Sequence, residues 1–89
     1  TVVSPGVLEG DSLEGVRYRS AAHMSGWWLL GSKYDGDVAT VRTVHTHHVT
    51  KVRPDLIKYL ALPFGTRFDL RNDERVWFDQ EVASQPPAE

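Results

Sequence analysis

Apolar residues occur in short runs along the chain, and turn-forming residues separate these runs. Apolar and basic residues alternate over residues 16–22, a pattern that predicts a strand with one face turned inward. The continuous apolar run 27–30 lies between Gly26 and Gly31, and such a run is typical of a strand covered on both faces. We therefore expect residues 27–30 to form the centre of a sheet.

Two turn signals predict hairpins. Asp35 and Gly36 follow the run 27–30 and precede the apolar stretch 38–44, and Asp-Gly favours a tight hairpin because glycine accepts a positive φ without strain. The polar segment 71–74 separates two further strand-like segments, 66–70 and 75–79, in the same way. The sequence thus predicts one hairpin on each side of its middle region.

The middle region has helical periodicity. Val49, Val52, Leu56 and Leu60 recur at intervals of three and four residues. Because a proline ring fits the first turn of a helix but not its interior, Pro54 predicts a short turn that ends near residue 53 and a main helix that begins at 54.

This order, β-β-β-α-β-β, predicts an α+β fold in which one main helix packs on one face of an antiparallel sheet of about five strands. We expect a single domain over residues 1–89, with a folded core at about 13–82. Turn-forming residues in 1–12 predict a flexible lead-in, and two prolines in 83–89 predict a solvated tail.

The composition of the 89-residue chain, with 40% apolar and 25% charged residues, is ordinary for one globular domain. No apolar run approaches the roughly 20 residues that cross a bilayer, so we expect a cytoplasmic protein without a membrane partner. The absence of cysteine excludes disulfides, thiolate chemistry and cysteine-based zinc sites.

The net charge of −2 does not predict a nucleic-acid partner, because phosphate binding requires clustered Lys and Arg. The charges are nevertheless unevenly distributed. Residues 1–15 carry three acids and no base, residues 16–58 carry seven bases and three acids, and six acids follow from residue 59 onward. This pattern suits a charged partner, and it equally suits a surface that keeps the protein in solution.

The sequence contains only weak candidates for an active site. The histidines His45, His47 and His48 form a weak candidate metal site, because a real site needs three or four convergent ligands. The carboxylate pairs at 35/37 and 69/79 are explained by turns and solvated strand faces, and no nucleophile elbow or phosphate loop is present. We expect no cofactor and no enzyme activity.

Nine aromatic residues are more than so short a chain can bury fully. In a strand, Trp27 and Trp28 point to opposite faces, as do Trp77 and Phe78. We expect one member of each pair to pack under the helix and the other to lie on a face that is either covered by loops or used as an interface.

Several spaced blocks resemble the immunity protein 33 family of small bacterial domains associated with polymorphic toxins. The blocks are Ser25-Gly26-Trp27-Trp28-Leu29-Leu30, Tyr34-x-Gly36-Asp37-Val38, the stretch 53–68 around Arg53-Pro54-Asp55-Leu56 and Leu62-Pro63-x-Gly65, and Val76-Trp77-Phe78-Asp79. The resemblance covers about residues 20–80. It implies that the protein neutralises a cognate toxin by binding it, and it supplies no catalytic residues.

The expected contacts combine an outward-facing aromatic residue with a tyrosine and acids on two turns and a strand end. They are Trp28, Tyr34, Asp35, Asp37, Asp73, Glu74 and Asp79. If the toxin were a nuclease, the acids would mimic phosphates in its cleft. The alternatives are a small regulatory or ligand-binding domain of a larger protein and a His-dependent metal enzyme. The pattern leaves open whether the chain is a monomer or a homodimer.

Overall fold

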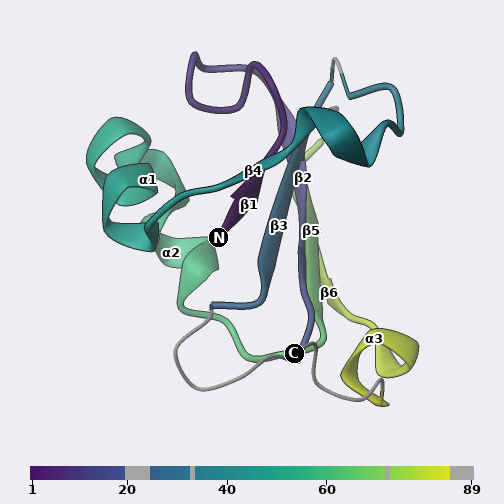
Figure 1. Cartoon of the computed structure of the whole chain (residues 1–89). Helices are drawn as coiled ribbons and strands as arrows, with labels where there is room; N and C mark the ends of the chain where they lie inside the picture. The colour runs from purple at the N-terminus through teal and green to yellow at the C-terminus, as the bar shows by residue number, and fades with distance from the viewer. Residues whose placement is uncertain (20–24, 33, 72, 85–89) are drawn as a thin grey trace.

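Six strands form one sheet in the order β4-β1-β3-β2-β5-β6 (Figure 1). The computed structural model describes residues 1–19, 25–32, 34–71 and 73–84. The strands are β1 (Val2–Val3), β2 (Leu13–Arg17), β3 (Trp27–Gly31), β4 (Arg42–Thr43), β5 (Thr66–Asp69) and β6 (Arg75–Phe78). The α+β class is confirmed. The sheet is mixed, however, because β1 runs parallel to β3 while every other pair is antiparallel.

The sixth strand comes from the segment 1–12, so the prediction of a flexible lead-in was wrong. β1 lies between β3 and β4, and Val3 and Val7 are buried in the main core. Ser4 is tied to β3 because its N–H donates to the Leu29 carbonyl (3.0 Å) and its hydroxyl accepts the Gly31 N–H (2.8 Å). The Pro and Gly residues do form turns, but the valines between them are apolar enough to be buried.

The predicted hairpin at residues 35–36 was also wrong. β3 pairs with β1 and β2, whereas residues 38–44 form a 3₁₀ turn, η1 (Val38–Thr40), and then β4 beyond β1. The strand predicted at residues 16–22 is β2, which begins at Leu13. Residues 20–22 of the prediction lie outside the described residues. The second hairpin, β5–β6, is confirmed.

The helical segment is broken at Pro54, as predicted, but no single main helix follows. It consists of α1 (Thr46–Val52), the 3₁₀ turn η2 (Pro54–Leu56) and α2 (Ile57–Leu60). A further helix, α3 (Gln80–Ser84), includes the first two residues of the expected tail, while residues 85–89 lie outside the described part.

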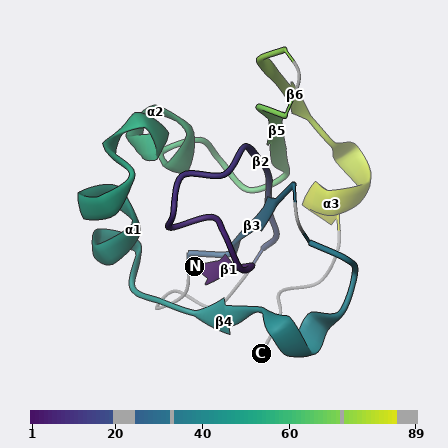
Figure 2. The ribbon, with the colours of Figure 1, turned by 90° about the horizontal axis from the view of Figure 1, so that it is seen from above.

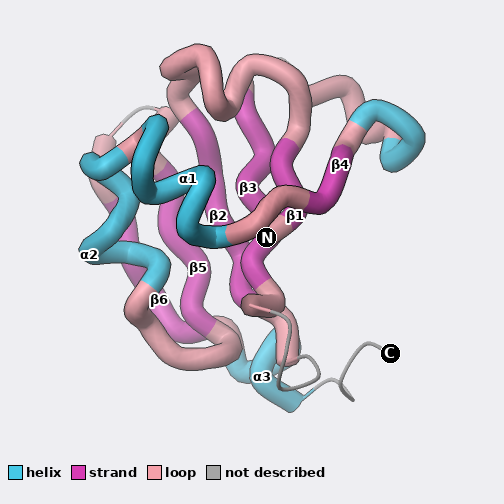
Figure 3. The backbone as a smooth tube through the Cα atoms, turned by 60° about the vertical axis from the view of Figure 1, so that its left-hand side comes forward, coloured by secondary structure: helices cyan, strands magenta, loops and turns pink. Residues whose placement is uncertain are grey.

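The main core lies between the sheet and the α1–α2 segment, which crosses one face of the sheet (Figure 3). The buried members of the cluster are Val3, Val7, Leu13, Trp27, Leu29, Val49, Leu56, Tyr59, Leu60 and Phe68. The Phe68 ring stacks on Tyr59 at 4.5 Å and tilts against Trp27 at 5.4 Å. Trp27 also donates its indole N–H to the Leu60 carbonyl (3.0 Å), so sheet and helix are joined by a buried hydrogen bond.

Candidate partner-binding surfaces

The outer face of the sheet is the face opposite α1 and α2. α3 lies on this side, as the view from above shows (Figure 2). Because directly paired residues share a face, the strand register places one row of side chains across five strands. The row consists of Val2, Trp28, Val16, Arg67 and Trp77. Val16 in this row is only 3% exposed, so the accessible surface comes from the residues on either side of it.

The two tryptophans of this row are incompletely covered. Trp28 is half-buried and meets Tyr18 edge to face at 6.3 Å, and Trp77 is 40% exposed. The guanidinium groups of Arg67 and Arg75 lie 6.0 and 5.4 Å from the Trp77 ring centroid, within the range of a cation–π contact. Together, these side chains form a surface of aromatic rings bordered by arginines.

The expected division of the aromatic pairs is correct for one pair and wrong for the other. Trp27 is buried under the helices while Trp28 faces outward, as alternation requires. In β6, by contrast, Phe78 is 55% exposed although it points to the helix side. β6 is an edge strand, and all four of its residues are exposed.

Carboxylates of the outer face are already paired with arginines. Arg71 bonds Asp69 and Glu14, each at 3.1 Å, and Arg67 bonds Asp79 at 3.1 Å. Hydrogen bonds from the side chain and backbone of Arg71 lower the pKa of Asp69, so this carboxylate stays ionised. The outer face can therefore meet a partner without leaving these acids unpaired.

The predicted acidic contacts lie mainly at one end of the sheet. Asp35 and Asp37 follow β3, while Asp73 and Glu74 belong to the β5–β6 turn. β3 and β5 run in the same direction, because both are antiparallel to β2, so both turns lie at the same end. β2 and β5 separate β3 from β6, and Figure 2 shows the β5–β6 turn apart from the segment that follows β3. The structure therefore does not bring them together into one cluster.

The acids of these turns differ in their partners. Asp35 and Asp37 are exposed and accept backbone N–H groups two residues ahead, at 3.0 and 2.9 Å, which fixes the turn. Glu74 accepts the Tyr59 hydroxyl and lies 3.4 Å from the Lys58 ammonium. These contacts lower the pKa of Glu74, the Tyr59 hydrogen bond most of all. Among the residues that the structure describes, Asp35, Asp37 and Asp73 have no cationic partner.

Asp79 and Tyr34 occupy separate places. Asp79 lies at the far end of β6, where its carboxylate accepts the N–H groups of Glu81 and Val82 (3.0 and 3.4 Å) and so caps α3. Tyr34 is half-buried just beyond β3 and donates its backbone N–H to the Gly31 carbonyl (3.1 Å). Neither residue adjoins the β5–β6 turn.

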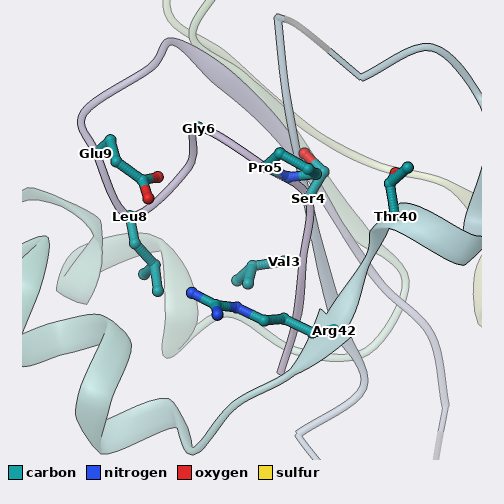
Figure 4. A pocket seen from close by; sticks show the side chains of 8 residues that line it. All are labelled: Val3, Ser4, Pro5, Gly6, Leu8, Glu9, Thr40 and Arg42. Atoms are coloured by element: carbon teal, nitrogen blue, oxygen red, sulfur yellow. The ribbon is translucent and has the colours of Figure 1, made fainter.

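A pocket of about 250 Å³ opens between the N-terminal loop and the strand segment at β4. Its lining residues are Val3, Ser4, Pro5, Gly6, Leu8, Glu9, Thr40 and Arg42. The Arg42 side chain extends beneath Val3 toward the loop that carries Leu8 and Glu9 (Figure 4). The pocket is smaller than the roughly 300–1,000 Å³ typical of small-molecule sites, so we regard it as secondary to the outer face.

A family model for the Imm33-like domain matches residues 1–79. The chain belongs to this family. The match covers the β1 segment and the histidine segment as well as the blocks at 25–79. No curated protein and no solved structure matches the chain. Membership of an immunity-protein family favours a role in binding over one in catalysis.

The histidines of this Imm33-like domain do not converge. His45 precedes α1 as its N-terminal flanking residue, His47 and His48 lie in the first turn of α1, and all three are exposed. Across the described residues, no three His, Asp or Glu side chains lie together as metal ligands would. No described helix has the length and apolarity that crossing a membrane requires.

The outer face of the Imm33-like domain contains residues that the sequence did not single out as contacts. They are Val2, Tyr18, Leu30, Arg67, Arg75 and Trp77. Two of these residues could have been found from the predicted β5–β6 hairpin, because a strand register centred on its turn places Arg67 beside Trp77. The strand β1, which extends the face past Trp28, gave no such signal.

Proposed function

We propose that this protein is an immunity protein that binds a cognate bacterial toxin directly and neutralises it in the cytoplasm of the cell that carries both. The match to the Imm33-like family over residues 1–79 carries this proposal. Inhibition by occupancy requires a surface that the toxin can contact and no reactive group, and we propose that the outer face is this surface.

The toxin docks on the outer face, with Trp28 and Trp77 as anchors. Tryptophan is the residue most enriched among interface hot spots, since one side chain offers a large rigid apolar area and a hydrogen-bond donor. The flanking Arg67 and Arg75 give orientation at the rim. Trp77 is 40% exposed and Trp28 is half-buried, so neither anchor has to leave the core before binding.

The acidic residues form a second part of the proposed contact. Tyr34, Asp35 and Asp37 lie on one turn, and Asp73 and Glu74 lie on the other. If the toxin has a basic cleft, Asp35, Asp37 and Asp73 would enter it as phosphate mimics, because no described residue pairs a cation with these carboxylates. Glu74 and Asp79 would contribute less, because each is already paired within the chain.

The experiment is co-expression with the toxin domain encoded by the neighbouring gene, read out as growth and as complex formation in vitro. The wild-type chain restores growth. Trp28→Ala and Trp77→Ala each weaken binding by about 30-fold or more, corresponding to a hot-spot loss of about 2 kcal/mol. Ile57→Ala serves as the matched control, because Ile57 is 53% exposed but lies on α2, away from the outer face.

Three outcomes separate the parts of the proposal. Failure of the wild-type chain to bind or rescue rejects the immunity function. Full binding by both tryptophan variants rejects the outer face as the contact. Unchanged binding after charge reversal at Asp35, Asp37 and Asp73 rejects the phosphate-mimic contribution and leaves the aromatic contact standing.

A further inference from the structure

Strand β6 is an edge of the sheet that is exposed along its whole length. Val76 is 48% exposed and its neighbours Trp77 and Phe78 are exposed as well, and in the described part of the chain no strand pairs with their free side. The opposite edge, β4, has only two residues. A longer, apolar edge with unpaired backbone groups is a template for another strand.

The direction of the backbone groups along β6 follows from one hydrogen bond. The Asp79 N–H donates to the Gly65 carbonyl (2.7 Å), which makes 79–65 a hydrogen-bonded pair of the β5–β6 ladder. Because such pairs alternate in an antiparallel ladder, residues 77 and 75 also face β5. The N–H and C=O groups of Val76 and Phe78 therefore face the free edge.

The helix that follows β6 leaves this edge open. A Cβ atom on Gly65 would lie 2.6 Å from the Ala83 Cβ, so α3 packs back against the start of β5. The chain thus turns away from the edge directly after Asp79. A second strand could approach β6 without meeting α3.

The edge is self-complementary in charge, although Arg67 of the same chain already bonds Asp79 at 3.1 Å. It reads Arg75-Val76-Trp77-Phe78-Asp79, with a base at one end, an acid at the other and three apolar residues between them. An antiparallel copy of such a strand places each base opposite an acid. A partner of unrelated sequence would have to provide this pattern, whereas a second copy of the chain has it already.

We propose that two copies of this chain pair antiparallel through β6 about a two-fold axis at Trp77, so that Arg75 of each copy lies opposite Asp79 of the other. Within the strand, this is the only register in which both edge-facing residues of each copy form backbone hydrogen bonds. Val76 of each copy then pairs with Phe78 of the other. This register forms four backbone hydrogen bonds. The two Trp77 side chains then face each other at the non-hydrogen-bonded pair, where the strands approach most closely.

Such a contact is small, since interfaces below about 1,200 Å² are weak and transient. We expect a dissociation constant on the order of 10–100 µM. The proposal concerns the chain alone and does not rest on toxin binding, so it can fail while the immunity function holds, and the reverse.

Sedimentation velocity of the wild-type chain tests the association. Between about 10 µM and about 1 mM, the weight-average mass should rise from that of the 10.0 kDa monomer toward twice that value. A single monomeric species over the whole range overturns the proposal.

Two variants test the surface. Val76→Pro removes an N–H that faces the free edge and bonds none of the described residues, and it should weaken association by about tenfold or more. Val76→Thr, which keeps the N–H, should stay within about threefold of the wild type. Arg75→Glu leaves the backbone intact and should also weaken association by about tenfold, because it places like charges opposite Asp79. Unaltered dimerisation in both Val76→Pro and Arg75→Glu, each shown to be folded by circular dichroism, contradicts the β6 contact.

Single introduced cysteines test the register, because the chain has none of its own. Trp77→Cys should form an intermolecular disulfide readily on mild oxidation, since residues 77 of the two copies are directly opposite. Val76→Cys should cross-link much more slowly, because its directly opposite residue is Phe78. Faster cross-linking at 76 than at 77 overturns the two-fold axis at Trp77.

Discussion

The two faces of the sheet carry aromatic residues in similar number but cover them differently. On the inner face Trp27 and Phe68 are buried against α1 and α2, whereas on the outer face Trp28 is half-buried and Trp77 is 40% exposed. The alternation that produces both faces is the same. Whether an aromatic residue of this chain serves as core or as contact surface is therefore decided by what lies above it.

The largest difference in stability is expected when one aromatic ring is removed from each face. Phe68→Ala should destabilise the domain by about 3–5 kcal/mol, because it leaves a cavity beneath Tyr59 and beside Trp27. Trp77→Ala should cost no more than about 1 kcal/mol, because its ring is already partly in solvent. Urea unfolding followed by far-ultraviolet circular dichroism measures both.

Equal losses of unfolding free energy for the two variants would show that the outer face contributes to the core. If Phe68→Ala leaves too little folded protein to measure, Phe68→Leu provides a milder substitution for which we expect the same order of stabilities. A Phe68→Leu variant no less stable than Trp77→Ala would contradict the contrast.

The elements that the sequence predicted correctly depend on local signals. The β5–β6 hairpin follows from a polar turn between two strand-like segments, and the break at Pro54 follows from the geometry of one ring. β1, in contrast, pairs Val2 with Trp28, far along the chain, and two residues carry no periodicity. The turn-forming residues around these two valines therefore led to the prediction of a flexible segment.

The candidate surface was predictable to a similar extent. Alternation at 27–28 identified Trp28 as the outward-facing residue, because β3 lies inside the sheet and Trp27 is buried in the core beneath α1 and α2. The same rule failed at 77–78, because β6 is the outermost strand and both residues stay exposed. Strand order is a long-range property that the local pattern does not contain.

An intermediate loss of stability is expected from substitutions at the glycines that face the core. A Cβ atom at Gly15 would lie within 3.0 Å of three atoms of the Phe68 ring. Gly15→Ala should therefore destabilise the domain by about 1–3 kcal/mol through overpacking. At Gly31, on β3, the nearest atom would lie at 3.4 Å, so Gly31→Ala should cost clearly less. Thermal unfolding of the two variants compares the sites, and an equal loss would show that the Phe68 ring moves aside freely.

The smallest expected effect concerns the outer face and its dependence on pH. The pKa of Asp69 is lowered from 3.8 in the folded protein, chiefly by the side-chain hydrogen bond from Arg71. A depressed carboxyl pKa stabilises the folded state above about pH 3.8, and this contribution is lost as the pH falls through the folded value. Asp69→Asn should be less stable than the wild type at pH 7 by no more than about 1 kcal/mol, because the pair is near the surface.

Below pH 3.8 the difference between the two proteins should shrink, since the wild-type carboxyl is then progressively protonated. Urea unfolding at a series of pH values measures this convergence. Asp35→Asn is the matched control, because it removes a carboxylate with no cationic partner among the described residues while Arg71 keeps its pair. A constant difference between Asp69→Asn and the wild type across the whole series would mean that the Arg71 contact does not depend on charge. The strand pairing and the aromatic row would then be what holds the outer face in place, without a contribution from the charge of Asp69.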